Sequence, residues 1–301
     1  MQTKSQIQQL FDEAGLRPNK RFGQNFLIDR NLMRMLVDAA GLTKDDFVLE
    51  VGCATGSLTE ELAGEAGLVI AVEIDKKLAE IAGGQLAGLD NVQIISTDVL
   101  SDKHTINPGI IGIIKKARQE FGGRFLLISN LPYSAATPLM LNLVCGAVPA
   151  DSASSPLADA MYITVQREVA ERMMAGAGDS EYGILSAILS CFGDLKAIRK
   201  LPAAVFWPMP KVESAMISFV RSSQKAGQVK DAGILTAVVS LFMQHRRKMV
   251  KAIVKYAAGD LAGISNWDEL FEKSGIDPQS RPQTIPPEKF LHLANLCRDS
   301  L

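Results

Sequence analysis

The residues Asn130-Leu131-Pro132-Tyr133 have chemical groups that suit a reaction at a flat amine. They follow the apolar run at 125–128, which is typical of a buried parallel strand, and ligands bind at the carboxyl ends of such strands. Pro132 fixes its own φ and favours extended backbone at Leu131, so the carbonyl groups point in set directions. The pattern predicts a rigid set of hydrogen-bond acceptors beside an aromatic ring. The plainer interpretation is a proline turn with a tyrosine in the core.

This acceptor set could activate the exocyclic amine of adenine, which is a poor nucleophile because its lone pair is delocalised into the ring. The Asn130 side-chain oxygen and a backbone carbonyl of Leu131 or Pro132 would favour a pyramidal nitrogen with a free lone pair. Tyr133 could stack on the base. Catalysis would then rest on positioning and electrostatics, with in-line transfer of a methyl group and no strong base.

A glycine turn and two acids predict the methyl donor. Gly52 and Gly56 are four residues apart, so the turn lacks the G-x-G-x-x-G spacing that binds a dinucleotide pyrophosphate. Glu73 can accept both hydroxyls of a ribose, and Asp98 can accept a hydrogen bond from an adenine amine. An acid at a strand end is also a common helix N-cap. Together, these residues indicate an adenosine without phosphates, which favours S-adenosylmethionine.

The elements that must position these residues alternate between strands and helices. Strands are expected at 47–51, 68–73, 92–95, 125–128, 160–165, 194–200 and 214–220. Helices are expected at 30–40, after residue 59, at about 76–86, within 101–123, near 138–145, at 167–174 and at 184–192. This alternation predicts a mostly parallel, doubly wound sheet, hence a Rossmann-like α/β fold.

The pattern changes at residues 222–230, which are polar and contain glycine. Beyond them only helical periodicity appears. We therefore expect a catalytic domain at residues 1–223, with an N-terminal arm at 1–16, and a small all-helical C-terminal domain at residues 228–301.

The charge distribution limits where nucleic acid can bind. The formal net charge of the chain is −1, so binding must come from a local patch. No acid occurs from Gln244 to Gly259, and basic residues recur at every fourth position, which predicts the basic face of one helix. A solvated helix face is the alternative. We expect RNA contacts from Arg246, Arg247, Lys248, Lys251 and Lys255.

The composition is that of a globular protein, with 47% apolar and 22% charged residues. The four cysteines are far apart and form no C-x-x-C pair, which argues against a zinc site and fits a reducing compartment. We find no signal peptide and no apolar run of the roughly 20 residues that cross a membrane. We therefore expect a cytoplasmic monomer without a metal.

Eight short motifs run in order over nearly the whole chain. They are F-G-Q-N-F-L at 22–27, E-V-G-x-x-x-G-x-L-T at 50–59, V-E-I-D at 72–75, N-L-P-Y at 130–133, E-Y-G-x-L-S at 181–186, F-x-P-x-P-K-V-x-S at 206–214, Q-x-R-R-K at 244–248 and G-I-D-P at 275–278. This set resembles the KsgA-type rRNA adenine N6,N6-dimethyltransferases, the small-subunit rRNA adenine dimethyltransferase family. The resemblance favours the interpretation of residues 17–27 as a loop that covers a ligand, where their basic and polar composition alone favours a solvated loop.

The resemblance implies roles for individual residues. Contacts with S-adenosylmethionine are expected from the turn at Gly52 and Gly56 and from Asn25, Leu27, Glu73, Asp98 and Asn130. Tyr133 and Phe206 are expected to flank the target adenine beside Asn130, Leu131 and Pro132. The implied substrate is a pair of adjacent adenosines in the 3′-terminal hairpin loop of small-subunit (16S-type) rRNA, each methylated twice. A role in small-subunit biogenesis, with the immature subunit as partner, is also implied.

The first turn departs from the family pattern. Gly-Pro-Gly is usual there, whereas this chain has Gly52-Cys53-Ala54. Ala54 adds a methyl group where the backbone nears the donor, and it fits if its φ is negative. Cys53 is expected to be a small filler rather than a covalent nucleophile.

Three other functions share part of the pattern. Large-subunit rRNA methyltransferases that confer macrolide resistance have the same catalytic motifs, but the Q-x-R-R-K and G-I-D-P motifs favour the small-subunit group. Glutamine methyltransferases of release factors use Asn-Pro-Pro-Tyr, whereas this chain has Leu131. A non-catalytic ribosome-assembly checkpoint with a decayed donor site would be consistent with Cys53 and Ala54.

Overall fold

The computed structural model describes residues 2–19, 22–146 and 156–301, without the side chains of Tyr133 and Ser134. The chain forms two compact units, which we call the sheet unit and the helical unit. The sheet unit comprises Met1–Leu143, Ser154–Ala170 and Lys196–Phe219, and the helical unit comprises Val144–Ala153, Glu171–Leu195 and Val220–Leu301. Residues 171–195 thus group with the C-terminal helices in this division. The expected domains at 1–223 and 228–301 stay a prediction.

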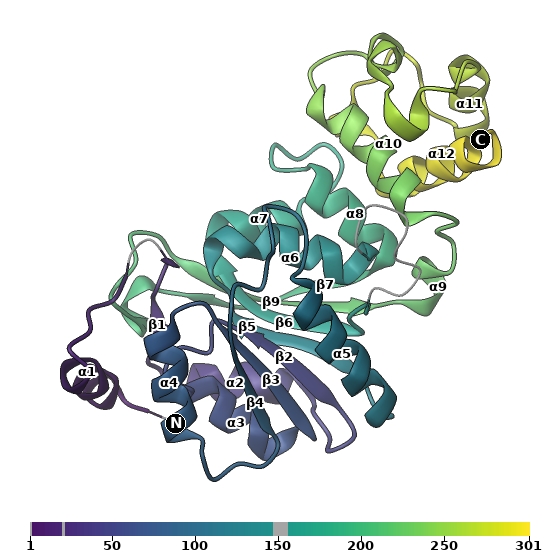
Figure 1. Cartoon of the computed structure of the whole chain (residues 1–301). Coiled ribbons are helices and arrows are strands. Elements are labelled where there is room, and N and C mark those ends of the chain that lie inside the picture. Colours follow the sequence, from purple (N-terminus) through teal and green to yellow (C-terminus); the bar gives the residue numbers. More distant parts are fainter. Residues whose placement is uncertain (1, 20–21, 147–155) are drawn as a thin grey trace. The chain divides into compact units, whose positions relative to one another are not determined.

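Seven strands form the central sheet, in the order β4-β3-β2-β5-β6-β9-β7 (Figure 1). Their bounds are β2 (Phe47–Val51), β3 (Leu68–Glu73), β4 (Val92–Ser96), β5 (Phe125–Asn130), β6 (Ala160–Gln166), β7 (Gly193–Leu201) and β9 (Ser214–Arg221). The first five pair in parallel. The chain runs from β2 outward to β4 and then returns to β5, so β2 and β5 flank the switch point where such sheets bind ligands. The predicted doubly wound sheet is confirmed.

Helices cover both faces of the sheet because the strands are apolar on both sides. Helices α2 (Arg30–Ala40), α3 (Ser57–Glu65) and α4 (Lys76–Gln85) share one buried cluster with alternate residues of the strands. Helix α5 (Pro108–Glu120) lies on the other face, where the Arg118 guanidinium is 5.5 Å from the centre of the Phe47 ring. The division between the two units falls within α6 (Tyr133–Cys145), after Leu143, and within α7 (Arg167–Met174), after Ala170.

Helix α6 begins earlier than predicted. The sequence predicted this helix near residues 138–145. Instead, α6 begins at Tyr133, directly after Pro132, and contains Pro138 in its interior. The helix therefore starts at the end of the predicted catalytic turn.

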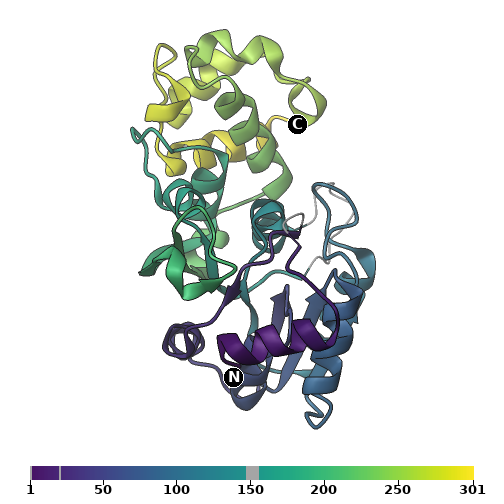
Figure 2. The ribbon, with the colours of Figure 1, turned by 90° about the vertical axis from the view of Figure 1, so that its left-hand side faces the viewer.

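An N-terminal arm packs on the outside of the sheet unit. Two short strands that the sequence did not reveal, β1 (Phe26–Leu27) and β8 (Phe206–Trp207), pair antiparallel. Helix α1 (Lys4–Glu13) packs against this pair through Phe11, whose ring centre lies 5.3 Å from that of Phe26 and 5.5 Å from that of Trp207. Figure 2 shows α1 in dark purple near the N-terminus.

The helical unit has its own aromatic core. Its helices are α8 (Ile184–Phe192), α9 (Ser223–Ala226), α10 (Ala232–Gln244), α11 (Trp267–Ser274) and α12 (Pro287–Asp299). The Phe242 ring lies about 6 Å from three other rings, those of Trp267, Phe271 and Phe290. Tyr182, in the E-Y-G-x-L-S motif, is fully buried and donates a hydrogen bond to the Ile285 carbonyl at 2.9 Å. No helix in the described part of the chain is long and apolar enough to cross a membrane.

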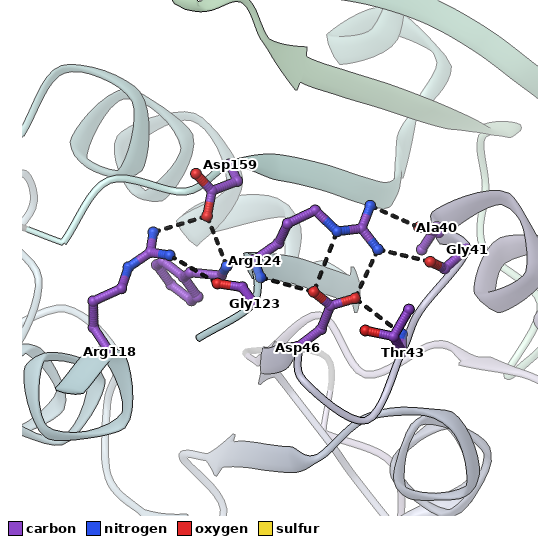
Figure 3. Close-up of polar contacts among 9 residues, drawn as sticks. Ala40, Gly41, Thr43, Asp46, Arg118, Gly123, Arg124 and Asp159 are labelled. Carbon is purple, nitrogen blue, oxygen red and sulfur yellow. Dashed lines mark hydrogen bonds and ion pairs between the residues drawn. The ribbon is translucent and has the colours of Figure 1, made fainter. Parts of the chain in front are cut away.

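Two ion pairs, Arg124–Asp46 and Arg118–Asp159, lie at the amino ends of β2 and β5 (Figure 3). The Arg124 guanidinium donates to both carboxylate oxygens of buried Asp46, at 3.3 and 2.7 Å, and to the carbonyls of residues 40 and 41. Arg118 donates to Asp159, which also accepts the Phe125 N–H. Burial alone would raise the pKa of Asp46, but hydrogen bonds from Arg124 and Thr43 lower it overall.

Candidate active site

A cavity of about 430 Å³ opens at the carboxyl ends of the parallel strands of the sheet unit. Residues that follow β2, β3, β4 and β5 line it, and residues 22–26 of the F-G-Q-N-F-L loop border it. The cavity brings together seven predicted site residues: Asn25, Gly52, Glu73, Asp98, Asn130, Leu131 and Pro132. Its volume is in the range of pockets that enclose a cofactor-sized ligand.

Glu73 ends β3 inside this cavity with both carboxylate oxygens already oriented. One oxygen accepts the Ala54 N–H and the other accepts the Asp75 N–H, each at 2.9 Å. Glu73 is 5% exposed, and its burial raises the pKa of the carboxyl although these hydrogen bonds oppose the rise. Each oxygen retains acceptor capacity, because a carboxylate can accept about four hydrogen bonds. Two neighbouring hydroxyls, such as those of a ribose, are therefore suitable partners.

Asn130 is held with its amide in one orientation. Its side-chain nitrogen donates to the Asn25 carbonyl at 2.9 Å, so its oxygen is the group left to accept from a ligand. The Pro132 carbonyl accepts the Ala135 N–H at 3.0 Å. Among the described hydrogen bonds none uses the Leu131 carbonyl. Of the two carbonyls that the sequence left open, that of Leu131 is therefore the one without a described hydrogen bond.

The turn after β2 packs against the turn after β5. Gly52 has a φ of +81°, and a Cβ at this position would lie 3.1 Å from the Pro132 ring. Gly56 does not line the cavity, and a Cβ there would approach Leu86 to 2.8 Å. Gly52 thus allows the close approach of the two turns at the cavity, whereas Gly56 allows α3 to start against α4.

The prediction for Ala54 is corrected by its backbone. The sequence allowed alanine there if its φ were negative, but φ is +54°, in the left-handed region that disfavours a Cβ. The conformation directs the Ala54 N–H at Glu73. Its methyl group packs against a buried cluster that includes Ile7 and Phe11. The structure therefore accommodates this departure from the family pattern at the cost of local strain.

Comparisons with known proteins agree with this geometry. The sequence profile of the family described as ribosomal RNA adenine dimethylase matches residues 15–299. The chain belongs to this family. It is an adenine dimethyltransferase that uses S-adenosylmethionine as methyl donor.

Similar curated proteins span nearly its full length. The "Ribosomal RNA small subunit methyltransferase A" of Leuconostoc mesenteroides is 33% identical over 298 residues, which cover 98% of this chain and 95% of that protein. The protein of the same name from Caldanaerobacter subterraneus subsp. tengcongensis is 34% identical over 93% of this chain and 97% of its own length.

Among solved structures, a dimethyladenosine transferase from Plasmodium falciparum superposes with a TM-score of 0.69 at 21% identity, covering 88% of this chain and 94% of that one. The 23S rRNA methyltransferase ErmE superposes with a TM-score of 0.61 at 20% identity, covering 90% and 98%. These likenesses confirm the predicted Rossmann-like methyltransferase fold.

The cavity of the methyltransferase fits its donor electrostatically. Three acids (Glu73, Asp98 and Asp102) and one cation, Lys103, line it, so the lining is acidic on balance. No described ion pair joins Glu73 or Asp98 to a cation of the chain. One Asp98 oxygen accepts the Leu100 N–H at 2.9 Å, and the side chain is exposed to the cavity mouth. S-adenosylmethionine supplies an electrophilic methyl group on a positively charged sulfur. An acidic lining favours such a cation over a neutral or anionic ligand.

Besides Gly56, three predicted site residues are placed away from the cavity or are not described. Leu27 is buried in β1 and lines a smaller chamber of about 50 Å³ beneath the turn. Phe206 is 3% exposed in the core, paired with Leu27. The Tyr133 side chain lies outside the described residues. The stacking roles of Tyr133 and Phe206 stay predictions.

Two buried groups beneath the turn are not nucleophiles. Cys53 is 3% exposed, and burial raises the pKa of its thiol well above the ordinary value, so the reactive thiolate is disfavoured. Glu50 is 2% exposed and accepts a hydrogen bond from the Thr59 hydroxyl at 2.7 Å. Burial raises the pKa of Glu50 to about 8, and the nearby charge of Glu73 adds to the rise.

Gln2 is a site residue that the sequence did not reveal. It lies in the N-terminal arm and forms hydrogen bonds with the turn between β2 and α3. Its side chain donates to the Thr55 carbonyl at 2.9 Å and accepts from the Thr55 hydroxyl at 2.6 Å. Its backbone N–H donates to the Ser57 hydroxyl at 2.9 Å. Gln2 is 8% exposed. No pattern in a polar N-terminal segment could have revealed these contacts, because their partners are more than 50 residues away.

The prediction that the basic residues after Gln244 lie on one face of a single helix is wrong. Helix α10 ends at Gln244, and the basic residues continue in a turn and in two short 3₁₀ helices, Val250–Ala252 and Val254–Tyr256. The regular spacing of cations at every fourth position therefore does not form one α-helical stripe. The cause is tertiary, because buried Val250 and Ile253 fix these turns against the helical unit.

The five predicted RNA contacts separate into two groups. Arg246 is half-buried, and its guanidinium donates to the carbonyls of Ser180 and Tyr182 at 2.6 and 3.3 Å. It therefore supports the fold of the helical unit. The other four side chains are exposed: Arg247, Lys248, Lys251 and Lys255. Within the described residues, no group of His, Cys, Asp and Glu could hold a metal ion.

Proposed function

We propose that this methyltransferase dimethylates the N6 amines of two adjacent adenosines in the 3′-terminal hairpin loop of small-subunit rRNA. Its physiological partner would be the immature small ribosomal subunit, which it would bind as a cytoplasmic monomer during subunit biogenesis. The observation that carries the proposal is the oriented Asn130 amide beside the Leu131 carbonyl, which accepts no described hydrogen bond, in the lining of a cavity that fits the donor. Full-length relatives named for the small subunit support the choice of RNA.

In this proposal the cavity holds the donor and the turn after β5 holds the acceptor. Glu73 binds the ribose hydroxyls of the donor, and Asp98 accepts from its adenine amine. In the first transfer the Asn130 oxygen and the Leu131 carbonyl accept the two hydrogens of the target amine, which aims the nitrogen lone pair at the methyl group. Each transfer breaks the sulfur–methyl bond, forms a nitrogen–methyl bond and releases one amine proton, so one hydrogen remains for these acceptors in the second transfer. The target adenosine must leave its stack to enter the pocket. The same site then serves four methylations, two on each base.

The test is mass spectrometry of rRNA after incubation with the enzyme and isotopically labelled S-adenosylmethionine. The substrates, offered in parallel, are the small and the large subunits from a strain that lacks the dimethylation. We expect four labelled methyl groups for each subunit, all on one pair of adjacent adenosines near the 3′ end. Label on large-subunit rRNA instead, or single methyl groups at scattered adenosines, would contradict the proposed substrate.

Donor binding alone distinguishes the proposed methyltransferase from a non-catalytic ribosome-assembly checkpoint. If strain at Ala54 had abolished the donor site, isothermal titration would show no binding of S-adenosylmethionine at millimolar concentration. We expect micromolar binding, because the Ala54 N–H retains its bond to Glu73 in spite of its φ.

A further inference from the structure

An exposed aromatic ring lies among the lysines of the helical unit. Tyr256 closes the second of the two 3₁₀ helices and is 39% exposed. The Lys248 ammonium lies 4.4 Å from the centre of its ring, and the Lys255 ammonium lies 5.3 Å from it. Lys248 also donates to the tyrosine hydroxyl, so it meets the ring at its polar end. None of the roles derived above for this protein uses Tyr256.

A second ring holds Tyr256 in place. The His245 ring is stacked on it, with ring centres 4.3 Å apart and planes inclined by 30°. His245 directly follows α10, and its backbone N–H donates to the carbonyl of Phe242, which is in the core. The Tyr256 N–H donates to fully buried Ile253 at 2.8 Å. The two-ring stack is therefore anchored at both ends to the packed interior of the helical unit.

The charged side chains in the segment that contains this stack are all basic. No acid occurs from residue 244 to residue 259. Arg247 and Lys251 are exposed, and neither takes part in an ion pair that the structure describes. In this segment Val250 and Ile253 supply the buried side chains, whereas Tyr256 is 39% exposed. An anchored ring within a field of uncompensated cations is the arrangement that binds unpaired nucleotides.

We infer that Tyr256 is a stacking platform for one unpaired nucleotide of the rRNA, with Lys248 and Lys255 binding the phosphates on either side. The base adds to the His245–Tyr256 stack as a third ring. It must be unpaired, because both faces of a base inside a duplex are covered by its neighbours. This inference rests on the proposed rRNA substrate, and it adds a contact that depends on a base rather than on charge.

Salt dependence separates stacking from phosphate binding. We expect Tyr256→Ala to weaken binding to undimethylated small subunits about 5- to 100-fold, the range measured for loss of one stacked base. The slope of log affinity against log salt should stay that of the wild type, because no cation is lost. Lys251→Ala, which removes a cation and keeps the ring, is the matched comparison for Tyr256→Ala. It should reduce the magnitude of that slope by about one. Tyr256→Phe should bind within about threefold of the wild type, because it keeps the ring.

The full-length protein is used throughout, and melting temperature and donor binding are measured for every variant. Should Tyr256→Ala fail to fold, Tyr256→Leu keeps apolar volume without a ring and should show the same loss. Binding by Tyr256→Ala or Tyr256→Leu within twofold of the wild type would overturn the inference, as would a salt slope reduced as in Lys251→Ala. If the wild-type protein does not bind small subunits, the proposed function has failed. If only the stacking results fail, the proposed substrate stands.

Discussion

At the two ends of strands β2 and β5, polar groups differ in how much of their hydrogen-bonding capacity is used within the protein. At the amino ends, both oxygens of Asp46 are taken by Arg124 and Thr43. At the carboxyl ends, the Asn130 oxygen and the Leu131 carbonyl accept no hydrogen bond among the described residues. The carboxyls also differ, because hydrogen bonds lower the pKa of Asp46 while burial raises the pKa of Glu73. Satisfied groups stabilise the fold, and oriented groups with spare capacity mark the site of chemistry.

The largest effect should come from Asn130→Ala at the carboxyl end. Removing one preoriented acceptor should lower the rate of methyl transfer about 100- to 1,000-fold, as for other groups that stabilise a transition state. The unfolding free energy should fall by only about 1 kcal/mol, from the lost bond to Asn25. Single-turnover rates and chemical denaturation measure the two quantities.

Asn142→Ala is its matched control. This amide on α6 also donates to carbonyls, those of Pro138 and His104, but it does not line the cavity. Its methylation rate should stay within about threefold of the wild type. A wild-type rate in Asn130→Ala would contradict the proposed mechanism.

The opposite result is expected for Arg124→Met at the amino end. It leaves the buried Asp46 carboxylate without its cation, so the unfolding free energy at pH 7 should fall by about 2–4 kcal/mol. The rate per folded molecule should be unchanged. The loss should shrink as pH falls toward and below 3.8, the ordinary pKa of an aspartate, because stability from a lowered pKa is lost as the carboxylate is protonated.

The exposed pair Lys273–Glu269 supplies the comparison for that variant, since both side chains are more than half exposed. Lys273→Met should lower the stability in urea denaturation far less than Arg124→Met does, because water screens this exposed pair. Equal losses in the two variants would show that burial of Asp46 does not decide the effect.

Glu50→Gln tests a buried acid that lies between the two ends. The folded protein keeps a proton on Glu50 up to about pH 8, whereas an ordinary glutamate loses it near 4.5. The wild-type stability should therefore decrease as pH rises between these values, by up to about 1.4 kcal/mol per pH unit. The glutamine variant lacks this decrease and should be the more stable protein at pH 8. Parallel stability curves for the two proteins would show that Glu50 does not hold its proton.

The smallest effect should come from Gln2→Ala, which removes hydrogen bonds to the turn between β2 and α3 and changes no residue that lines the cavity. The loss of three hydrogen bonds to Thr55 and Ser57 should weaken donor binding about three- to tenfold, with kcat within twofold of the wild type. Gln6→Ala, which breaks only the capping box of α1, should leave donor affinity unchanged. Titration calorimetry with S-adenosylmethionine measures the donor affinity of each variant. Equal donor affinities of Gln2→Ala and Gln6→Ala would show that the hydrogen bonds of Gln2 do not support donor binding.

Local patterns in the sequence determined the parallel sheet and the carboxyl-end residues Glu73, Asp98 and Asn130, because parallel strands align their carboxyl ends at one edge. Tertiary contacts decided the rest. Ala54 has a positive φ, and its N–H donates to Glu73, while Gln2 donates to the carbonyl of a residue 53 positions away. The basic residues after Gln244 lie in 3₁₀ turns because Val250 and Ile253 are buried, although their spacing fits an α-helix. Spacing along the chain fixes periodicity and strand ends, whereas backbone strain and distant hydrogen bonds depend on partners that only the folded chain brings together.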